Sequence, residues 1–166
     1  DDLIRKIEIL SEDLINTWEK NNQVFICGNG GSAANAIHIA NDLHYGLGVN
    51  ANRDGKGLKV EALPANSAVI TCLANDTGYE NIFSHQLKVK AKKDDLLIVL
   101  SGSGNSPNIV NVLKEGNIIG LKSYGILGFD GGKCKTLATK AIHFQINDML
   151  ISEDIQMIVF NICFQW

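Results

Sequence analysis

Long hydrophobic runs are missing from this chain. No apolar stretch approaches the ~20 residues that a membrane-spanning helix requires, and the acidic start, Asp1-Asp2, is unlike a secretory signal. The four cysteines lie far apart and form no CxxC pair, and three of them sit in apolar runs, as small core residues do. We therefore expect reduced thiols and a cytoplasmic location.

Excess charge of one sign is absent as well. The net charge is −3 over 166 residues, and the lysines are scattered among acids, so the chain has no electrostatic footprint for a nucleic acid or an anionic membrane. Internal repeats, low-complexity tracts and Pro/Ser-rich linkers are also missing. With 45% hydrophobic residues, the chain is expected to form one globular domain over residues 1–166 that binds a small polar ligand.

Strand and helix patterns alternate along the sequence. Residues 1 to about 21 carry apolar side chains at helical spacing, and Ser106 and Ser152 are expected to cap later helices. Short apolar runs typical of buried strands occupy residues 23–28, 58–63, 95–101, 123–128 and 141–146. Helical patterns occupy residues 32–43, 66–73 and 80–91 and begin again at 106, 133 and 152. This alternation predicts a three-layer, doubly wound α/β domain with about five parallel strands.

Two glycine-serine loops follow predicted strands, Gly28–Ser32 and Ser101–Ser106. In doubly wound folds, ligands bind beyond the carboxyl ends of the strands. Glycine lets the backbone approach a ligand closely, and the N–H groups at the start of the next helix favour an anion. Serine hydroxyls and backbone amides can donate to phosphate oxygens without a permanent cation. The loops predict a phosphate-monoester site, and the alternative is that both are only tight turns.

A nucleotide is the weaker expectation. The first loop lacks the Lys-Ser/Thr ending of a phosphate-transferring P-loop. Gly28, Gly30 and Ala33 fit the pattern GxGxx(G/A), but a dinucleotide site also needs an acid about 20 residues onward at a strand end. The candidate acid, Glu61, lies further along the chain than this spacing allows. It also stands within its predicted strand rather than at the end of that strand.

Four segments in order, residues 27–42, 73–84, 100–110 and 152–156, resemble the sugar isomerase (SIS) family. Within it they resemble the phosphoheptose isomerases and a closely related, non-enzymatic replication-initiator-associating protein. The resemblance implies a flavodoxin-like domain that forms a homotetramer with sites between subunits. It also implies aldose–ketose isomerisation of a phosphorylated sugar such as sedoheptulose 7-phosphate. We expect the helix at about 1–21 to contribute to oligomerisation.

The resemblance also implies which residues bind the substrate. The phosphate is expected in the serine loop, at Ser101, Gly102, Ser103 and Ser106. The sugar is expected at Asn29, Gly30, Gly31, Ser32, Asn75, Asp76 and Gln156. An alternative for Asp76 is that it caps a turn.

Isomerisation moves a proton between adjacent carbons through an enediol, so it needs a base above the carbon and an acid near the oxygens. His38 and Asp42 are four residues apart and share one helix face. The resemblance implies Asp42 as the base, one methylene shorter than the family's usual glutamate, with His38, Glu153 or another histidine handling the oxygen protons. Glu153 and Asp154 could instead serve the dipole in the first turn of their helix. The family pair can contact zinc, so His38, Asp42 and Gln156 are candidate zinc ligands.

One departure from the family concerns catalysis directly. Phe164 stands where a histidine is expected two turns after Gln156, and the non-enzymatic relative lacks that histidine too. His44 and His85 are possible substitutes for it, whereas His143 lies within a predicted strand and is expected to be structural. The alternative function is therefore a non-catalytic sugar-phosphate sensor or scaffold.

Overall fold

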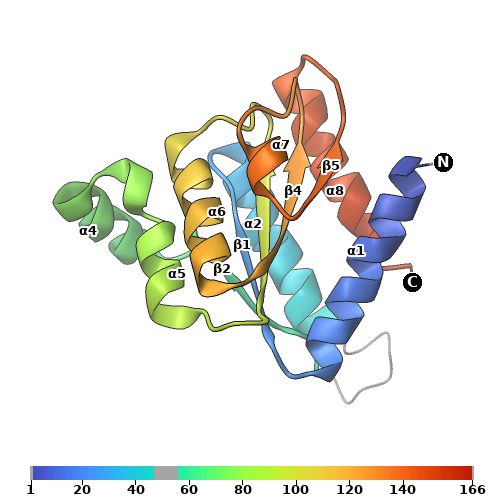
Figure 1. Cartoon of the computed structure of the whole chain (residues 1–166), viewed down its shortest axis with the longest axis horizontal. Helices are drawn as coiled ribbons and strands as arrows, with labels where there is room; N and C mark the ends of the chain where they lie inside the picture. Colours follow the sequence, from blue (N-terminus) through green and yellow to red (C-terminus); the bar gives the residue numbers. More distant parts are fainter. Residues whose placement is uncertain (1, 47–55, 166) are drawn as a thin grey trace.

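The sheet has five parallel strands. The computed structural model describes residues 2–46 and 56–165. Its strands are β1 (Gln23–Cys27), β2 (Lys59–Ala62), β3 (Leu96–Ser101), β4 (Lys122–Leu127) and β5 (Lys140–His143). They pair in the order β2-β1-β3-β4-β5, all parallel (Figure 1). This confirms the predicted doubly wound α/β fold.

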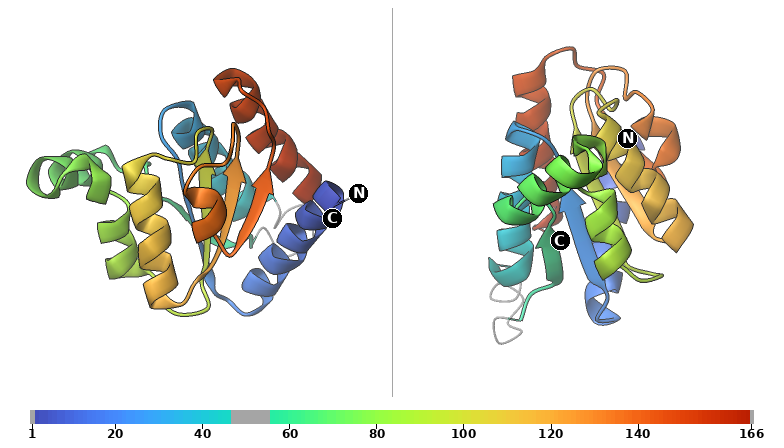
Figure 2. Two further views of the ribbon diagram at one scale, coloured as in Figure 1. Left: turned by 45° about the horizontal axis from the view of Figure 1, so that its top comes forward. Right: turned by 90° about the vertical axis from the view of Figure 1, so that its left-hand side faces the viewer.

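Helices cover both faces of this sheet, as Figure 2 shows. One face packs against α1 (Asp2–Glu19), α2 (Gly31–Asn41) and α8 (Met149–Cys163), and the other against α5 (Ser84–Lys90), α6 (Pro107–Ile119) and α7 (Cys134–Leu137). Side chains alternate between the two faces, so Ile98 joins the first core cluster and Leu97 the second. Every residue of β3 is buried, because this central strand is covered on both sides.

Several helices differ from their predicted bounds. After Asn41, α2 continues as a π-helical turn, η1 (Asp42–Gly46). The helix predicted at 80–91 is divided into a 3₁₀ turn, η2 (Tyr79–Asn81), and α5. Helix α4 (Ser67–Thr77) runs further than predicted, so it includes Asn75 and Asp76, and it stands away from the sheet (Figure 1). Most of the glycine-rich stretch at residues 46–57 lies outside the described residues.

The prediction that Ser152 caps the last helix is wrong. Helix α8 begins at Met149, and its N-cap is Asp148, whose carboxylate accepts a hydrogen bond from the Ile151 N–H at 3.1 Å. Asp148 has the extended backbone that an N-cap needs. Ser152 lies inside the helix and donates to the Asp148 carbonyl oxygen at 2.6 Å. Among the described residues, no helix combines the length and apolar character needed to cross a membrane.

Candidate functional site

The two glycine-serine loops meet at the carboxyl edge of the sheet. They follow β1 and β3, the neighbouring strands between which the chain order reverses, and such a switch point is where doubly wound folds bind ligands. A cavity of about 70 Å³ lies there. Its lining residues are Asn29, Ser32, Leu100, Ser101, Gly102, Ser103, Ser106, Met149 and Glu153. The structure thus brings together residues predicted from both loops, and adds Met149, which no sequence motif indicated.

Three serine hydroxyls in the second loop are arranged to donate. Ser101 Oγ accepts a hydrogen bond from the Gly104 N–H at 3.0 Å, and Ser103 Oγ accepts one from the Asn105 N–H at 3.3 Å. A hydroxyl that accepts from the backbone keeps its own proton for another acceptor. Ser106 occupies the N-cap position of α6 but its side chain makes no capping hydrogen bond. All three hydroxyls can therefore donate to an anion.

The backbone of this loop depends on glycine. Gly104 has φ +65° and lies against the carbonyl group of Gly131, so an L side chain there would be strained and would collide with backbone. Gly102 lies beneath the Met149 side chain, where an added Cβ would come within 2.4 Å of the Met149 sulfur if that side chain did not move. Met149 therefore packs directly over the loop.

The first loop is different, because its anion position is already filled. The Ser32 N–H, at the start of α2, donates to Glu153 Oε1 at 3.1 Å, and the same carboxylate lies against Gly31. Glu153 is the fifth residue of α8, so it lies beyond the first turn that sequence reasoning assigned to it. Its charge instead meets the N-terminus of α2. A protein carboxylate thus occupies the start of α2, at the first loop.

Gln156 links α2 to α8 and is only 1% exposed. Its Nε2 donates to Ser32 Oγ at 3.0 Å, and its Oε1 accepts from Asn35 Nδ2 at the same distance. Asn35 also donates to the Glu153 carbonyl oxygen at 2.9 Å. Both polar atoms of Gln156 are thus engaged within the protein. Asn35 was not singled out in the sequence, although it lies in the 27–42 segment that resembles the SIS family.

A pair of asparagines joins the two loops. Asn29 Nδ2 donates to Asn108 Oδ1 at 2.9 Å, and Asn108 Nδ2 donates back to Asn29 Oδ1 at 2.7 Å. The Tyr79 hydroxyl, from η2, also donates to Asn29 Oδ1, at 3.2 Å. Asn108 and Tyr79 were missed in the sequence, because nothing local indicates that either residue faces Asn29.

His38 and Asp42 contact each other but do not line the cavity. His38 Nε2 lies 3.3 Å from Asp42 Oδ2, with the two side chains 61% and 33% exposed. Asp42 Oδ1 accepts from Asn41 Nδ2 at 3.2 Å. Since an α-helix rises 1.5 Å per residue, Asp42 lies about 15 Å along the axis from Ser32. Within one chain, Asp42 is therefore distant from the cavity that Ser32 lines.

Other predicted residues also lie outside the cavity. Asn75 donates to its neighbour Asp76 at 2.8 Å on the exposed side of α4. His85, on α5, lines an apolar groove between α4 and α5, on the sheet face opposite α2. Phe164 packs against the core, with its ring centroid 6.3 Å from that of Phe160. Two histidines complete the set: His44 is exposed in η1, and His143 Nε2 lies 3.0 Å from the Phe129 carbonyl oxygen at the end of β5.

The zinc ligands suggested by the family do not form a set in one chain. A zinc site in a protein commonly takes at least three protein ligands. Gln156 Oε1, the atom that would bind the metal, already accepts from Asn35. Of the three candidate ligands, this leaves His38 and Asp42, which contact each other. Among residues 2–46 and 56–165, no cluster of three or more His, Cys, Asp or Glu side chains could hold a metal ion. These residues do not fit zinc within a single chain.

Comparison with known proteins places this chain in a family. Residues 1–128 match the SIS domain model. The chain is 35% identical over 151 residues to the phosphoheptose isomerase of Helicobacter pylori strain P12, covering 90% of this chain and 76% of that protein. It is 37% identical over 142 residues to the phosphoheptose isomerase of Aliarcobacter butzleri, covering 86% and 73%.

A solved structure shows the same architecture. The phosphoheptose isomerase of Neisseria gonorrhoeae superposes with a TM-score of 0.89 at 23% identity, covering 98% of this chain and 85% of that one. At that identity the likeness bears on the fold alone, whereas the sequence matches to the curated relatives bear on descent. The chain belongs to the phosphoheptose isomerase group of the SIS-domain family.

Proposed function

We propose that this protein is an aldose–ketose isomerase that acts on a sugar phosphate of the sedoheptulose 7-phosphate type. The observation that carries the proposal is the serine loop, in which Ser101, Ser103 and Ser106 hold donor hydroxyls around one cavity at the switch point. Neutral donors suit a phosphate monoester. The relatives are phosphoheptose isomerases, which agrees with this ligand.

The reaction needs a general base that removes a proton from carbon. In the proposed reaction, Asp42 removes the proton from the carbon next to the carbonyl, and the carbonyl oxygen gains a proton to give an enediol. Transfer of the proton from Asp42 to the former carbonyl carbon, while the other enediol hydroxyl loses its proton, completes the isomerisation. His38, in contact with Asp42, would pass protons between the two oxygens.

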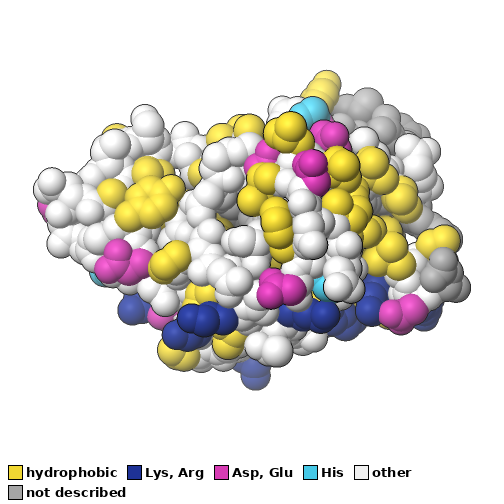
Figure 3. Space-filling view, turned by 90° about the horizontal axis from the view of Figure 1, so that it is seen from above, with side chains coloured by type: hydrophobic (Ala, Val, Ile, Leu, Met, Phe, Trp, Pro, Cys, Tyr) yellow, Lys and Arg dark blue, Asp and Glu magenta, His cyan; other side chains and the backbone are white. Residues whose placement is uncertain are grey.

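The position of Asp42 supports a site shared between copies of the chain. Asp42 lies about 15 Å along α2 from Ser32, which lines the cavity. A ligand phosphate in the serine loop would therefore leave the reacting carbon too far from the Asp42 of the same chain. Exposed apolar side chains on the neighbouring helices α2 and α8 favour contact with another copy: Ile37 is 45% exposed and Ile158 is 53% exposed. Figure 3 shows hydrophobic side chains gathered toward α8 at the carboxyl edge of the sheet.

We propose a cytoplasmic homotetramer of single-domain subunits, with α1 contributing to assembly.

The test is deuterium exchange from D₂O into sedoheptulose 7-phosphate at the carbon next to its carbonyl. The wild-type protein should exchange the hydrogen on this carbon for deuterium. Asp42→Asn, which keeps the shape of the side chain but removes the base, should lower the exchange rate by at least about 100-fold. Ser101→Ala/Ser103→Ala should weaken binding of the ligand. Wild-type exchange no faster than that of Asp42→Asn would refute the isomerase.

Phe164 favours the second candidate function, a sugar-phosphate sensor without turnover. Its packed aromatic ring can neither donate a proton nor bind a metal, and it stands where the family is expected to carry histidine. The sensor predicts that sedoheptulose 7-phosphate raises the melting temperature while exchange stays at the buffer rate. The isomerase predicts both effects.

A further inference from the structure

The reciprocal pair Asn29–Asn108 lies between the two loops of the site. Asn29 follows β1 and lines the cavity, whereas Asn108 is the second residue of α6 and is only 1% exposed. Each amide donates to the carbonyl oxygen of the other, at 2.9 and 2.7 Å. The pair therefore ties the sugar side of the site to the helix that follows the serine loop.

A backbone group sets the direction of both amides. The Ile109 N–H donates to Asn108 Oδ1 at 3.0 Å, and because an N–H can only donate, the Asn108 atom facing it must be the oxygen. The other Asn108 atom is then the nitrogen, which must donate to the oxygen of Asn29. The usual ambiguity of an asparagine flip is thereby removed at both residues.

Counting hydrogen bonds shows what Asn29 has left for a ligand. Its oxygen has two lone pairs, which accept from Asn108 Nδ2 and from the Tyr79 hydroxyl. One of its two N–H groups donates to Asn108. The remaining capacity is a single N–H, so Asn29 can donate to a ligand but cannot accept from one.

We infer that Asn108 is a positioning residue that restricts Asn29 to donating one hydrogen bond to an acceptor oxygen of the sugar, beside the phosphate in the serine loop. This inference rests on the proposed sugar-phosphate ligand. Asn108 acts through Asn29, and its own side chain is buried within the protein. An unpaired Asn29 would be free to rotate or flip, and would lose the fixed donor that discriminates a sugar phosphate from inorganic phosphate.

The test is a double-mutant cycle on ligand affinity with Asn29→Ala, Asn108→Leu and the double variant. Each single variant should bind sedoheptulose 7-phosphate about 10-fold more weakly, the loss expected for one buried hydrogen bond, and should bind inorganic phosphate within about 2-fold of wild type. The double variant should lose no more than either single. Additive losses, about 100-fold in the double variant, would show that Asn108 does not act through Asn29. Asn117→Ala, an exposed asparagine on the same helix, is the matched control and should change neither affinity.

A second variant covers the case in which Asn108→Leu does not fold. Asn108→Asp keeps the shape and can still accept from Asn29 and Ile109, but when ionised it cannot donate to Asn29 Oδ1. Its preference for the sugar phosphate over inorganic phosphate should be lost at neutral pH and return as the pH falls and the carboxyl gains a proton. Wild type should show no such return. A preference in Asn108→Asp that stays at the wild-type value at neutral pH would overturn the inference.

A measurement without ligand separates this inference from the proposed function. In wild type, one Asn29 Nδ2 proton should exchange with solvent more slowly than the other by NMR, because only one is bonded to Asn108. In Asn108→Leu, which removes the acceptor, the two should move toward equal rates as Asn29 loses its fixed orientation. If wild type does not bind sedoheptulose 7-phosphate, the proposed function fails and this measurement still decides the role of Asn108. Equal rates in wild type would refute the pairing.

Discussion

Glu153 has its backbone on α8 while its carboxylate serves the start of α2. The Ser32 N–H is one of the donors that a helix N-terminus leaves without an intrahelical partner, and Glu153 accepts from it at 3.1 Å. A negative charge at this position also interacts favourably with the positive end of the helix dipole. This geometry favours a stabilising role for Glu153 over the acid–base role that the family resemblance implied.

Glu153→Gln should lower the free energy of unfolding by about 0.5–1 kcal/mol, because glutamine keeps an acceptor oxygen but loses the charge. Urea denaturation at neutral pH measures this. Asp154→Asn is the matched control, since Asp154 is the next residue on α8 and is exposed, and it should change stability less. Equal losses in the two variants, or no loss in Glu153→Gln, would contradict the role assigned to Glu153.

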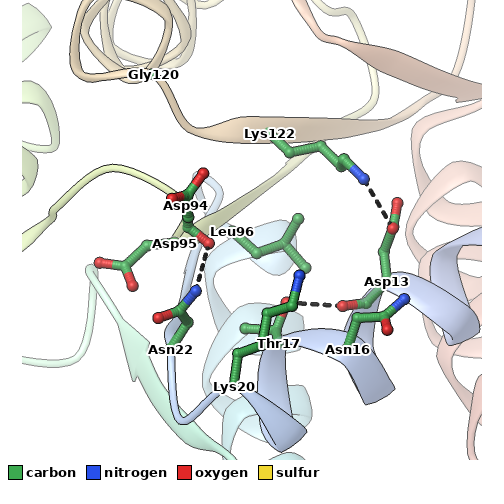
Figure 4. Close-up of a pocket in the computed structure, with 10 residues that line it drawn as sticks. All are labelled: Asp13, Asn16, Thr17, Lys20, Asn22, Asp94, Asp95, Leu96, Gly120 and Lys122. Atoms are coloured by element: carbon green, nitrogen blue, oxygen red, sulfur yellow. Dashed lines mark hydrogen bonds and ion pairs between the residues drawn. The ribbon is translucent and has the colours of Figure 1, made fainter.

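At the scale of elements, α1 is fixed to the sheet through Asp13. Lys122 Nζ, on β4, lies 2.8 Å from Asp13 Oδ1, and Figure 4 marks this ion pair with a dashed line. The Tyr124 hydroxyl and Lys140 Nζ approach Asp13 Oδ2 at 2.5 and 3.4 Å. Asp13 lines a cavity of about 470 Å³ at the edge of the sheet opposite the candidate site. Partial burial acts to raise the pKa of Asp13, but the hydrogen bonds from Lys122 and Tyr124 outweigh it and leave that pKa lowered.

The lowered pKa of Asp13 fixes the sign of a pH effect. A carboxyl group whose pKa is lower in the folded state stabilises the fold above its ordinary pKa near 4 and loses that contribution as the pH falls through the folded value. Asp13→Asn should therefore lower the free energy of unfolding by about 2 kcal/mol at pH 7. The difference from wild type should shrink at about pH 3, where the unfolded carboxyl is protonated.

Urea denaturation at several pH values between 3 and 7 would measure this narrowing. Glu12→Gln provides the control on the same helix, because the Glu12 side chain is 59% exposed and lies 3.6 Å from Arg5. It should change stability little at any pH. A deficit in Asp13→Asn that is the same at both ends of the range would mean that the charge of Asp13 is not what fixes α1.

At the scale of the whole molecule, the proposed site needs the serine loop of one chain and Asp42 of another. Two variants, each disabled at a different part of the site, should then complement each other. Asp42→Asn retains the loop, whereas Ser101→Ala/Ser103→Ala retains the base. In mixed oligomers assembled at equal amounts from the two variants, about a quarter of the sites should combine an intact loop with an intact base.

Deuterium exchange on mixed oligomers, prepared by co-expression, tests this expectation. Exchange should recover to about a quarter of the wild-type rate, while each variant alone remains slow. Mixing the two purified variants without subunit exchange is the control and should restore nothing. No recovery in the co-expressed oligomers would place the base and the loop in the same chain, against the shared-site proposal.

Much of the fold could be predicted from local patterns. Apolar runs predicted all five strands, and alternation with helices predicted that they are parallel. The serine loop could also be predicted, because its glycines and serines are contiguous. Ser152 was wrongly assigned as a cap because Asp148, four residues earlier, competes for the same helix end with a stronger acceptor.

The partners within the site could not be read from the sequence in the same way. Asn29 and Asn108 are 79 residues apart, and Ser32 and Glu153 are 121 apart. No spacing rule connects residues at such separations. Whether they meet depends on which strands are neighbours and on how the following helices start.

The sequence by itself determined the α/β class, the serine loop and the shared helix face of His38 and Asp42. Each depends on patterns of residues close together in the chain, and the α/β class on the order in which such local patterns follow one another. The tertiary structure decided that a carboxylate fills the start of α2, that two asparagines join the loops, and that Asp42 lies far from the serine loop of its own chain. These features depend on side chains brought together across the sheet, where the packing of whole elements sets the distances.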